Sequence, residues 1–166
     1  MKFRIGGFLE NSLVNGEGIR AVIFVSGCKH NCEGCQNDFM QDFDYGDSVS
    51  TEDILQKIKN CMPIIKGVTF SGGEPFESAI ALSKLSEGVR NLGLNIWCYS
   101  GYTFEEIAHS GDNDKLGLLE LIDVLVDGKF HEKLTSGASR YTGSYNQRII
   151  DCRKSILGNE IILWSK

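Results

Sequence analysis

The sequence predicts an α/β fold in which a mainly parallel sheet carries helices on its outside. Two observations indicate this class: short, apolar, β-branched runs recur along the chain, and segments of helical periodicity separate them. Strands that alternate with helices form βαβ units, which build parallel sheets with right-handed crossovers. The chain has 166 residues, of which 42% are hydrophobic, so we expect a single domain over residues 1–166.

The predicted strands are short apolar runs, and several end in glycine or serine. Four are expected at residues 20–26, 67–71, 94–100 and 123–127, and weaker strand patterns occupy residues 147–152 and 160–164.

Helices are predicted in the intervals between these strands. A capping pattern at residues 50–53 precedes apolar positions at helical spacing that continue to Met62. A second helical pattern covers residues 77–92, and Gly93 ends it. Short helices are expected to begin near Thr103 and to cover residues 118–122. Since ligands collect at the carboxyl ends of parallel strands, the loops after the strands should carry the chemistry.

The composition argues against several classes of protein. The formal net charge is −5 and no basic stripe is present, so nucleic-acid binding is not expected. The longest apolar run is far shorter than a membrane span, and the N-terminus has no signal-peptide core, so we expect a cytoplasmic protein that does not enter a membrane. In a reducing cytoplasm its cysteines are thiols or metal ligands.

Three cysteines directly follow the first predicted strand, at Cys28, Cys32 and Cys35. A closed zinc site or an electron-transfer cluster normally takes four protein ligands, whereas three leave one metal position open for another molecule. Two other interpretations are three buried thiols and a zinc site completed by His30. We expect His30 instead to be a solvated loop residue.

A glycine-glycine-glutamate turn ends the second predicted strand. Gly72 and Gly73 let the backbone approach a ligand closely, and Pro75 fixes the position of the Glu74 carboxylate. A backbone carbonyl and a carboxylate are both suitable partners for an ammonium group.

Together, a Cys-x3-Cys-x2-Cys loop after the first strand and Gly-Gly-Glu after a later one resemble the radical S-adenosylmethionine superfamily. The resemblance implies a short partial (β/α) barrel with a 4Fe-4S cluster, whose fourth iron binds S-adenosyl-L-methionine. The implied cluster ligands are Cys28, Cys32 and Cys35. The implied cofactor-binding residues are Gly34, Cys35, Gln36, Gly72, Gly73 and Glu74.

Residues 15–20 resemble the Gly-x-Gly-x-Arg element of glycyl-radical activating enzymes, and Asn37 after the third cysteine also fits them. Three later blocks, residues 100–106, 127–130 and 143–148, resemble the activating proteins of anaerobic ribonucleoside-triphosphate reductase. The chain departs from the family pattern at Gln36, where an aromatic residue is usual, and at Tyr145, where a small residue is usual. The resemblance implies that a 5'-deoxyadenosyl radical forms and removes hydrogen from a glycine of the reductase.

Within this reading, Asp127 and Lys129 are expected to contact the cofactor or the entering glycine loop, whereas Asn146, Gln147 and Arg148 receive no role. The chain has no other redox motif, so an external one-electron reductant such as a flavodoxin is implied. The exposed edges of a short partial barrel would suit a homodimer.

Three alternatives stay open from the sequence. The chain could activate another glycyl-radical enzyme, or it could be a radical enzyme like 7-carboxy-7-deazaguanine synthase. That second family usually has Asp-Thr after its third cysteine, where this chain has Gln36-Asn37. From a different class, it could be a small iron-sulfur electron carrier.

Overall fold

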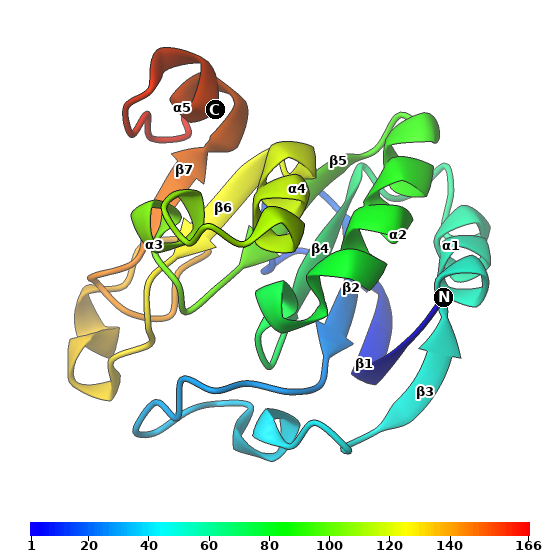
Figure 1. Cartoon of the computed structure of the whole chain (residues 1–166), viewed down its shortest axis with the longest axis horizontal. Helices are drawn as coiled ribbons and strands as arrows, with labels where there is room; N and C mark the ends of the chain where they lie inside the picture. Colours follow the sequence, from blue (N-terminus) through cyan, green and yellow to red (C-terminus); the bar gives the residue numbers. More distant parts are fainter.

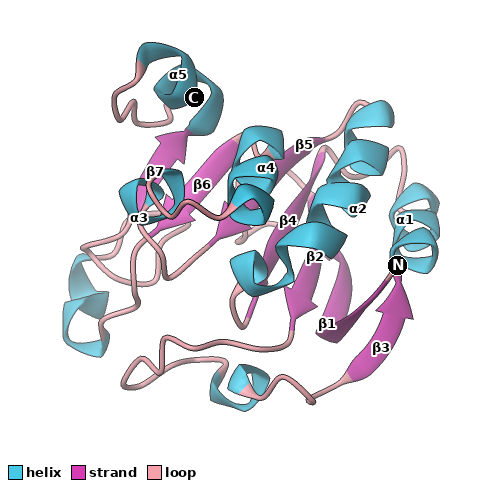
Figure 2. Cartoon of the chain, viewed as in Figure 1, coloured by secondary structure: helices cyan, strands magenta, loops and turns pink.

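The computed structural model describes residues 1–166 and contains one seven-stranded sheet with helices packed against it (Figures 1 and 2). The strand order is β3-β1-β2-β4-β5-β6-β7. The strands are β1 Lys2–Ser12, β2 Arg20–Val25, β3 Asp47–Ser50, β4 Gly67–Gly72, β5 Asn95–Tyr99, β6 Val124–Asp127 and β7 Arg148–Asp151. The central β2, β4, β5 and β6 run parallel, while β1, β3 and β7 pair antiparallel. This arrangement confirms the predicted fold class.

Three of the helices, α1, α2 and α4, lie side by side over one face of the sheet (Figure 1). The helices are α1 Thr51–Asn60, α2 Ala79–Asn91, α3 Phe104–Ala108, α4 Asn113–Leu121 and α5 Cys152–Gly158. The predicted caps are present: the Ser50 side chain accepts a hydrogen bond from the Asp53 amide, and Thr103 and Glu106 form a capping box. No helix combines the length and the apolar character that crossing a membrane requires.

The two faces of the sheet differ because successive strand residues point to opposite sides. Ile23, Phe70 and Cys98 are fully buried in the core beneath the helices. Phe24, Ser71 and Tyr99, each the next residue along its strand, line a cavity instead. The helix-free face therefore presents aromatic and polar side chains to a ligand space.

A buried arginine fastens the amino ends of the parallel strands. The Arg20 guanidinium is fully buried and donates to Thr69 Oγ1 at 2.7 Å and to the Val68 carbonyl at 2.8 Å. Its carbon lies 5.5 Å from the centre of the Trp97 ring. Burial lowers the pKa of Arg20 to about 10. Arg20 closes one of the blocks noted in the sequence, and it lies at the edge of the sheet opposite the loops that follow the strands.

The N-terminal strand pair β1–β3 is absent from the sequence-based prediction. β1 contains Gly6 and Gly7, and its pairing with β2 shifts register twice, between Ile5 and Gly7 and between Leu9 and Ser12. It therefore lacks a regular apolar alternation. Gly6 packs directly against the Met40 side chain. β3 has only four residues and is largely exposed.

Near the C-terminus, the expected strand at residues 160–164 is wrong. The chain forms α5 after β7, turns at Asn159 in the left-handed region, and returns with only an isolated bridge between Ile150 and Leu163. The helix expected at residues 118–122 begins earlier, because Asp112 caps α4 at Asn113.

Candidate functional site

The cysteine loop is an excursion from the sheet that is closed at its base. The Gly27 and Cys28 amides donate to the Met40 and Gln41 carbonyls at 2.8 and 3.0 Å, so the chain leaves and returns at one point. Gly27 has a φ of 101°, and a side chain there would collide with the Phe43 ring. The loop follows β2 directly and runs along the lower side of Figure 1.

Cys28, Cys32 and Cys35 are all partly exposed and line one cavity of about 520 Å³. Its other walls come from the loops after β4, β5 and β6, from the chain before β2 and from the chain before β7. The lining residues include Asn15, Gln36, Ser100, Phe130, Tyr141 and Gln147. The cavity thus lies at the carboxyl ends of the parallel strands, as the fold predicts.

The three thiols share this wall, but no three His, Cys, Asp or Glu side chains are already gathered around one point that a metal ion could occupy. A cubane cluster places each thiolate on a separate iron, so its ligands need not converge on one ion as zinc ligands do. Three soft donors facing one cavity therefore fit a 4Fe-4S cluster and leave space beside it for a further ligand.

The protein surroundings of the thiols act in opposing directions. Burial raises the pKa of the Cys28 thiol, although the His30 amide that points at its sulfur favours the thiolate. Burial likewise raises the pKa of the Cys32 thiol, whereas a hydrogen bond from the Phe130 amide acts to lower that pKa. Coordination of a cation would supply the positive charge that favours the thiolate form.

Gly72 and Gly73, at the end of β4, line the same cavity. Both positions need glycine, because neighbouring backbone leaves no room for a side chain. A side chain at Gly72, where φ is 102°, would meet the Val25 backbone, and one at Gly73 would meet the Gly27 and Met40 carbonyls. The Gly73 amide donates to the Val25 carbonyl at 2.8 Å. The Gly73 carbonyl accepts no hydrogen bond within the protein, which leaves it available to a ligand.

Behind these glycines, the Glu74 carboxylate is fully buried and accepts four contacts. Oε1 accepts from the Phe76 amide at 3.0 Å and from Ser100 Oγ at 2.9 Å. Oε2 accepts from the Gly101 amide at 2.8 Å and lies 2.7 Å from His30 Nε2. A carboxylate offers about four acceptor positions. All four acceptor positions of Glu74 are therefore occupied by protein groups, and its side chain is not among those that line the cavity.

The expectation that His30 is a solvated loop residue is wrong. Its side chain is 8% exposed and contacts Glu74, and its ring packs edge-on against Tyr102 with centroids 4.4 Å apart. The sequence offers no sign of this contact, because 44 positions separate His30 from Glu74.

The other residues expected beside the cluster lie on the same loop. Gln36 lines the cavity. Gly34 does not, and a side chain there would touch the Glu132 carboxylate from the loop after β6. Asn37 donates to the Gly72 carbonyl at 3.2 Å, so the segment after the third cysteine is tied to the glycine turn.

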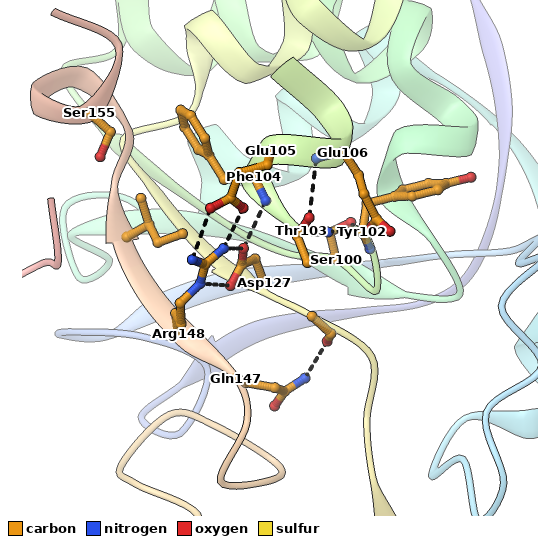
Figure 3. A network of polar contacts seen from close by, with 12 residues as sticks. Ser100, Tyr102, Thr103, Phe104, Glu105, Glu106, Asp127, Gln147, Arg148 and Ser155 are labelled. Atoms are coloured by element: carbon orange, nitrogen blue, oxygen red, sulfur yellow. Dashed lines mark hydrogen bonds and ion pairs between the residues drawn. The ribbon is translucent and has the colours of Figure 1, made fainter. Parts of the chain in front are cut away.

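Asp127 and Lys129 line a neighbouring polar cavity of about 510 Å³, which shares Gly101 and Gly128 with the first. The Asp127 side chain is 1% exposed and pairs with Arg148, with Oδ2 and Nη2 2.6 Å apart (Figure 3). It also accepts from the Phe104 amide at 2.8 Å, at the start of α3. In this structure Asp127 is thus engaged with β7 and α3.

Arg148 also binds Glu105, with Nη2 and Oε2 2.6 Å apart (Figure 3). The two carboxylates raise the pKa of Arg148, and its guanidinium lowers the pKa of Glu105. One arginine on β7 therefore joins the end of β6 to the first turn of α3.

Asn146 and Gln147, which had no role assigned from the sequence, close the base of the loop between β6 and β7. Gln147 donates to the Gly128 carbonyl at 3.0 Å and accepts from the Gly143 amide at 2.8 Å. Asn146 donates to the Lys129 carbonyl at 2.8 Å. These bonds hold the two ends of a loop that supplies Phe130 and Tyr141 to the cavity wall.

The chain is similar to known proteins over most of its length. A family model described as a 4Fe-4S single cluster domain matches residues 14–150. The anaerobic ribonucleoside-triphosphate reductase-activating protein of Haemophilus influenzae is 33% identical over 150 residues, which cover 86% of this chain and 94% of the relative. The chain belongs to this family. Proteins of the same name from Vibrio cholerae and Escherichia coli are 35% and 32% identical, over 82% and 81% of this chain and 90% of each relative.

The family assignment agrees with the sequence-based resemblance, and the matched range contains the three cysteines, the Gly72–Glu74 turn and residues 143–148. Among solved structures, the crystal structure of QueE from Escherichia coli is similar, with a TM-score of 0.53. It has 18% sequence identity and covers 62% of this chain and 54% of that one. This likeness concerns the fold alone.

Proposed function

We propose that this chain is a radical S-adenosylmethionine activase that generates a glycyl radical on anaerobic ribonucleoside-triphosphate reductase. Membership of the activating-protein family supports this function. The structural observation that carries it is one cavity lined by the three thiols of the cysteine loop and by Gly72 and Gly73. Its volume of about 520 Å³ is typical of cofactor sites.

In this proposal Cys28, Cys32 and Cys35 would hold a 4Fe-4S cluster through three of its irons, and the fourth iron would be open to S-adenosyl-L-methionine. The bound, reduced cluster would supply the one electron needed to cleave the cofactor to methionine and a 5'-deoxyadenosyl radical, and a hydrogen atom of a glycine Cα of the reductase would pass to that radical to give 5'-deoxyadenosine. The chain's own task is to place the reacting groups and to keep water away from them.

The cofactor-binding segments of the proposal are Gly34–Gln36 and Gly72–Glu74. The free Gly73 carbonyl is the partner we assign to the methionine ammonium, and Glu74 fixes the turn from behind through its four contacts. Asp127 and Lys129 are assigned to the adjoining cavity, where the rest of the cofactor or the glycine loop of the reductase would lie.

Four further features belong to the proposal. They are a single domain over residues 1–166, a cytoplasmic location, an external one-electron reductant such as a flavodoxin, and a homodimer. The remaining cysteines support an external reductant, because Cys98 and Cys152 are buried and Cys61 lies apart from the cavity. The exposed outer edge of β3 supports self-association.

The test is anaerobic reconstitution of the cluster, followed by incubation with reductant, S-adenosyl-L-methionine and the reductase of the same organism. Electron paramagnetic resonance should detect a glycyl radical on the reductase, and chromatography should detect 5'-deoxyadenosine. Omission of the cofactor should abolish both. A cluster spectrum that does not respond to the cofactor would favour an electron carrier, and cleavage without a radical on this reductase would indicate another target.

A further inference from the structure

Between the first and the third cysteine, His30 is the one residue, apart from the cysteines, that turns inward. Within residues 28–35 the three cysteines and His30 are partly or largely buried, whereas every other residue is exposed. The neighbouring Lys29 side chain is 69% exposed, against 8% for His30. A polar ring buried in a loop requires a specific partner.

That partner is the fully buried Glu74 carboxylate, with Nε2 and Oε2 2.7 Å apart. Glu74 accepts its other three hydrogen bonds, so we assign His30 Nε2 as the donor of this contact. The Tyr102 ring packs against the imidazole, and Gly101 leaves the space that the imidazole fills.

Glu74 connects three loops that line the cavity. It belongs to the turn after β4, it accepts from Ser100 and Gly101 after β5, and through His30 it reaches the loop after β2. Two other bonds join the glycine turn to the ends of the cysteine loop, from the Glu74 amide to the Gly27 carbonyl at 2.8 Å and from Asn37 to the Gly72 carbonyl at 3.2 Å. The His30–Glu74 contact is the bond that joins the turn to the loop between Cys28 and Cys32.

We propose that His30 is a positioning residue, which through Glu74 holds the cysteine loop at a fixed distance from Gly72 and Gly73. This inference rests on the proposed function, in which S-adenosyl-L-methionine is bound by the cluster at one end and by the glycine turn at the other. A ligand held at two points binds tightly only when the spacing between them is already correct. The cluster itself needs only the three thiols.

This separation of roles gives a test with matched variants. His30→Leu removes the donor and keeps an apolar side chain of similar size, whereas His30→Gln retains an N–H donor. Lys29→Gln is the control, because it removes an exposed ammonium group of the same loop, which pairs with Glu77 after β4. Each protein is reconstituted anaerobically, its iron is counted, and the cofactor is titrated while the electron paramagnetic resonance of the reduced cluster is recorded.

All three variants should retain the iron content of the wild type. The apparent Kd for S-adenosyl-L-methionine should rise about tenfold in His30→Leu, as expected for losing one hydrogen bond to a charged group. It should stay within about threefold in His30→Gln and be unchanged in Lys29→Gln.

Cluster-free protein supplies a second readout. Hydrogen–deuterium exchange over residues 28–35 should accelerate about tenfold in His30→Leu and not in Lys29→Gln. Unchanged exchange or an unchanged Kd in His30→Leu would overturn the inference. So would loss of the cluster, no rescue by His30→Gln, or equal weakening by Lys29→Gln. A wild-type spectrum that ignores the cofactor would instead overturn the proposed function, and this positioning role with it.

Discussion

Among the six cysteines, only Cys28, Cys32 and Cys35 line the central cavity, whereas Cys61 lies at the end of α1. We predict that changing any one of the three to alanine abolishes cofactor cleavage, because two thiolates cannot hold a 4Fe-4S cluster. Cys61→Ala should retain cluster and cleavage. Iron content, visible absorbance and 5'-deoxyadenosine yield measure the effect, and a full cluster spectrum with cleavage in any of the three variants would contradict it.

A second prediction concerns Glu77, which accepts from the Tyr102 hydroxyl at 2.6 Å. Burial acts to raise the pKa of Glu77, but the Tyr102 hydroxyl and the Lys29 ammonium outweigh it and lower that pKa below 4.5. A carboxyl group whose pKa is lower in the folded than in the unfolded state stabilises the protein at pH values above its unfolded-state pKa. This contribution is lost as the pH falls through the folded-state pKa.

Tyr102→Phe should therefore cost about 1.5 kcal/mol of unfolding free energy at neutral pH, and the difference from the wild type should shrink well below pH 4.5. Urea unfolding at a series of pH values measures it. Tyr45→Phe is the control, since Tyr45 is an exposed tyrosine far along the chain from Glu77. A pH-independent difference would show that Glu77 is not the partner that matters.

At the scale of elements, the loop between β6 and β7 depends on the base formed by Gln147. Gln147→Ala removes its bonds to Gly128 and Gly143. The loop should then open more often, and trypsin should cut about tenfold faster after the exposed Lys133 and Arg140. Mass spectrometry of timed digests measures the cleavage. Gln56→Ala on the surface of α1 should leave these rates unchanged, and equal rates in both variants would refute the role.

Elements with strong local patterns were predictable. The central strands are continuous apolar runs, and α1 begins with an N-cap serine followed by an acidic first turn, which is a local sequence pattern. β1 was not predictable because glycines and register shifts interrupt its alternation, and its stability comes from pairing with two neighbours. The Glu160–Trp164 segment has strand composition but meets β7 at only one bridge. Tertiary pairing, which no local pattern records, decided both cases.

The site divides in the same way. The spacing of the cysteines and the glycine turn are local, so the sequence alone predicts them. The contacts that organise the cavity join residues far apart: His30 meets Glu74 across 44 positions, and Gln147 meets Gly128 across 19. Gly72 and Gly73 are required by the fold as well as by a ligand, since a side chain at either position would collide with neighbouring backbone.

For the whole molecule, the two ends of the parallel strands carry different functions. The carboxyl ends carry the cavity, whereas Arg20 fastens the amino ends. Arg20→Met would leave buried carbonyls without their donor, so we predict a loss of about 3 kcal/mol in unfolding free energy with an unchanged Kd for the cofactor. Urea unfolding and cofactor titration measure the two quantities.

Lys66→Met provides the matched control for Arg20. Lys66 is an exposed cation at the same edge of the sheet, and its replacement should change stability by at most about 0.5 kcal/mol. A large change in cofactor affinity in Arg20→Met would mean that the two ends of the sheet are coupled.

The walls of the cavity come from both ends of the chain, from Asn15 before β2 to Gln147 before β7. During translation the ribosome releases the three cysteines early, while the segment that closes the last wall is made near the end. A nascent chain thus displays three thiols on an unfinished pocket for most of its synthesis.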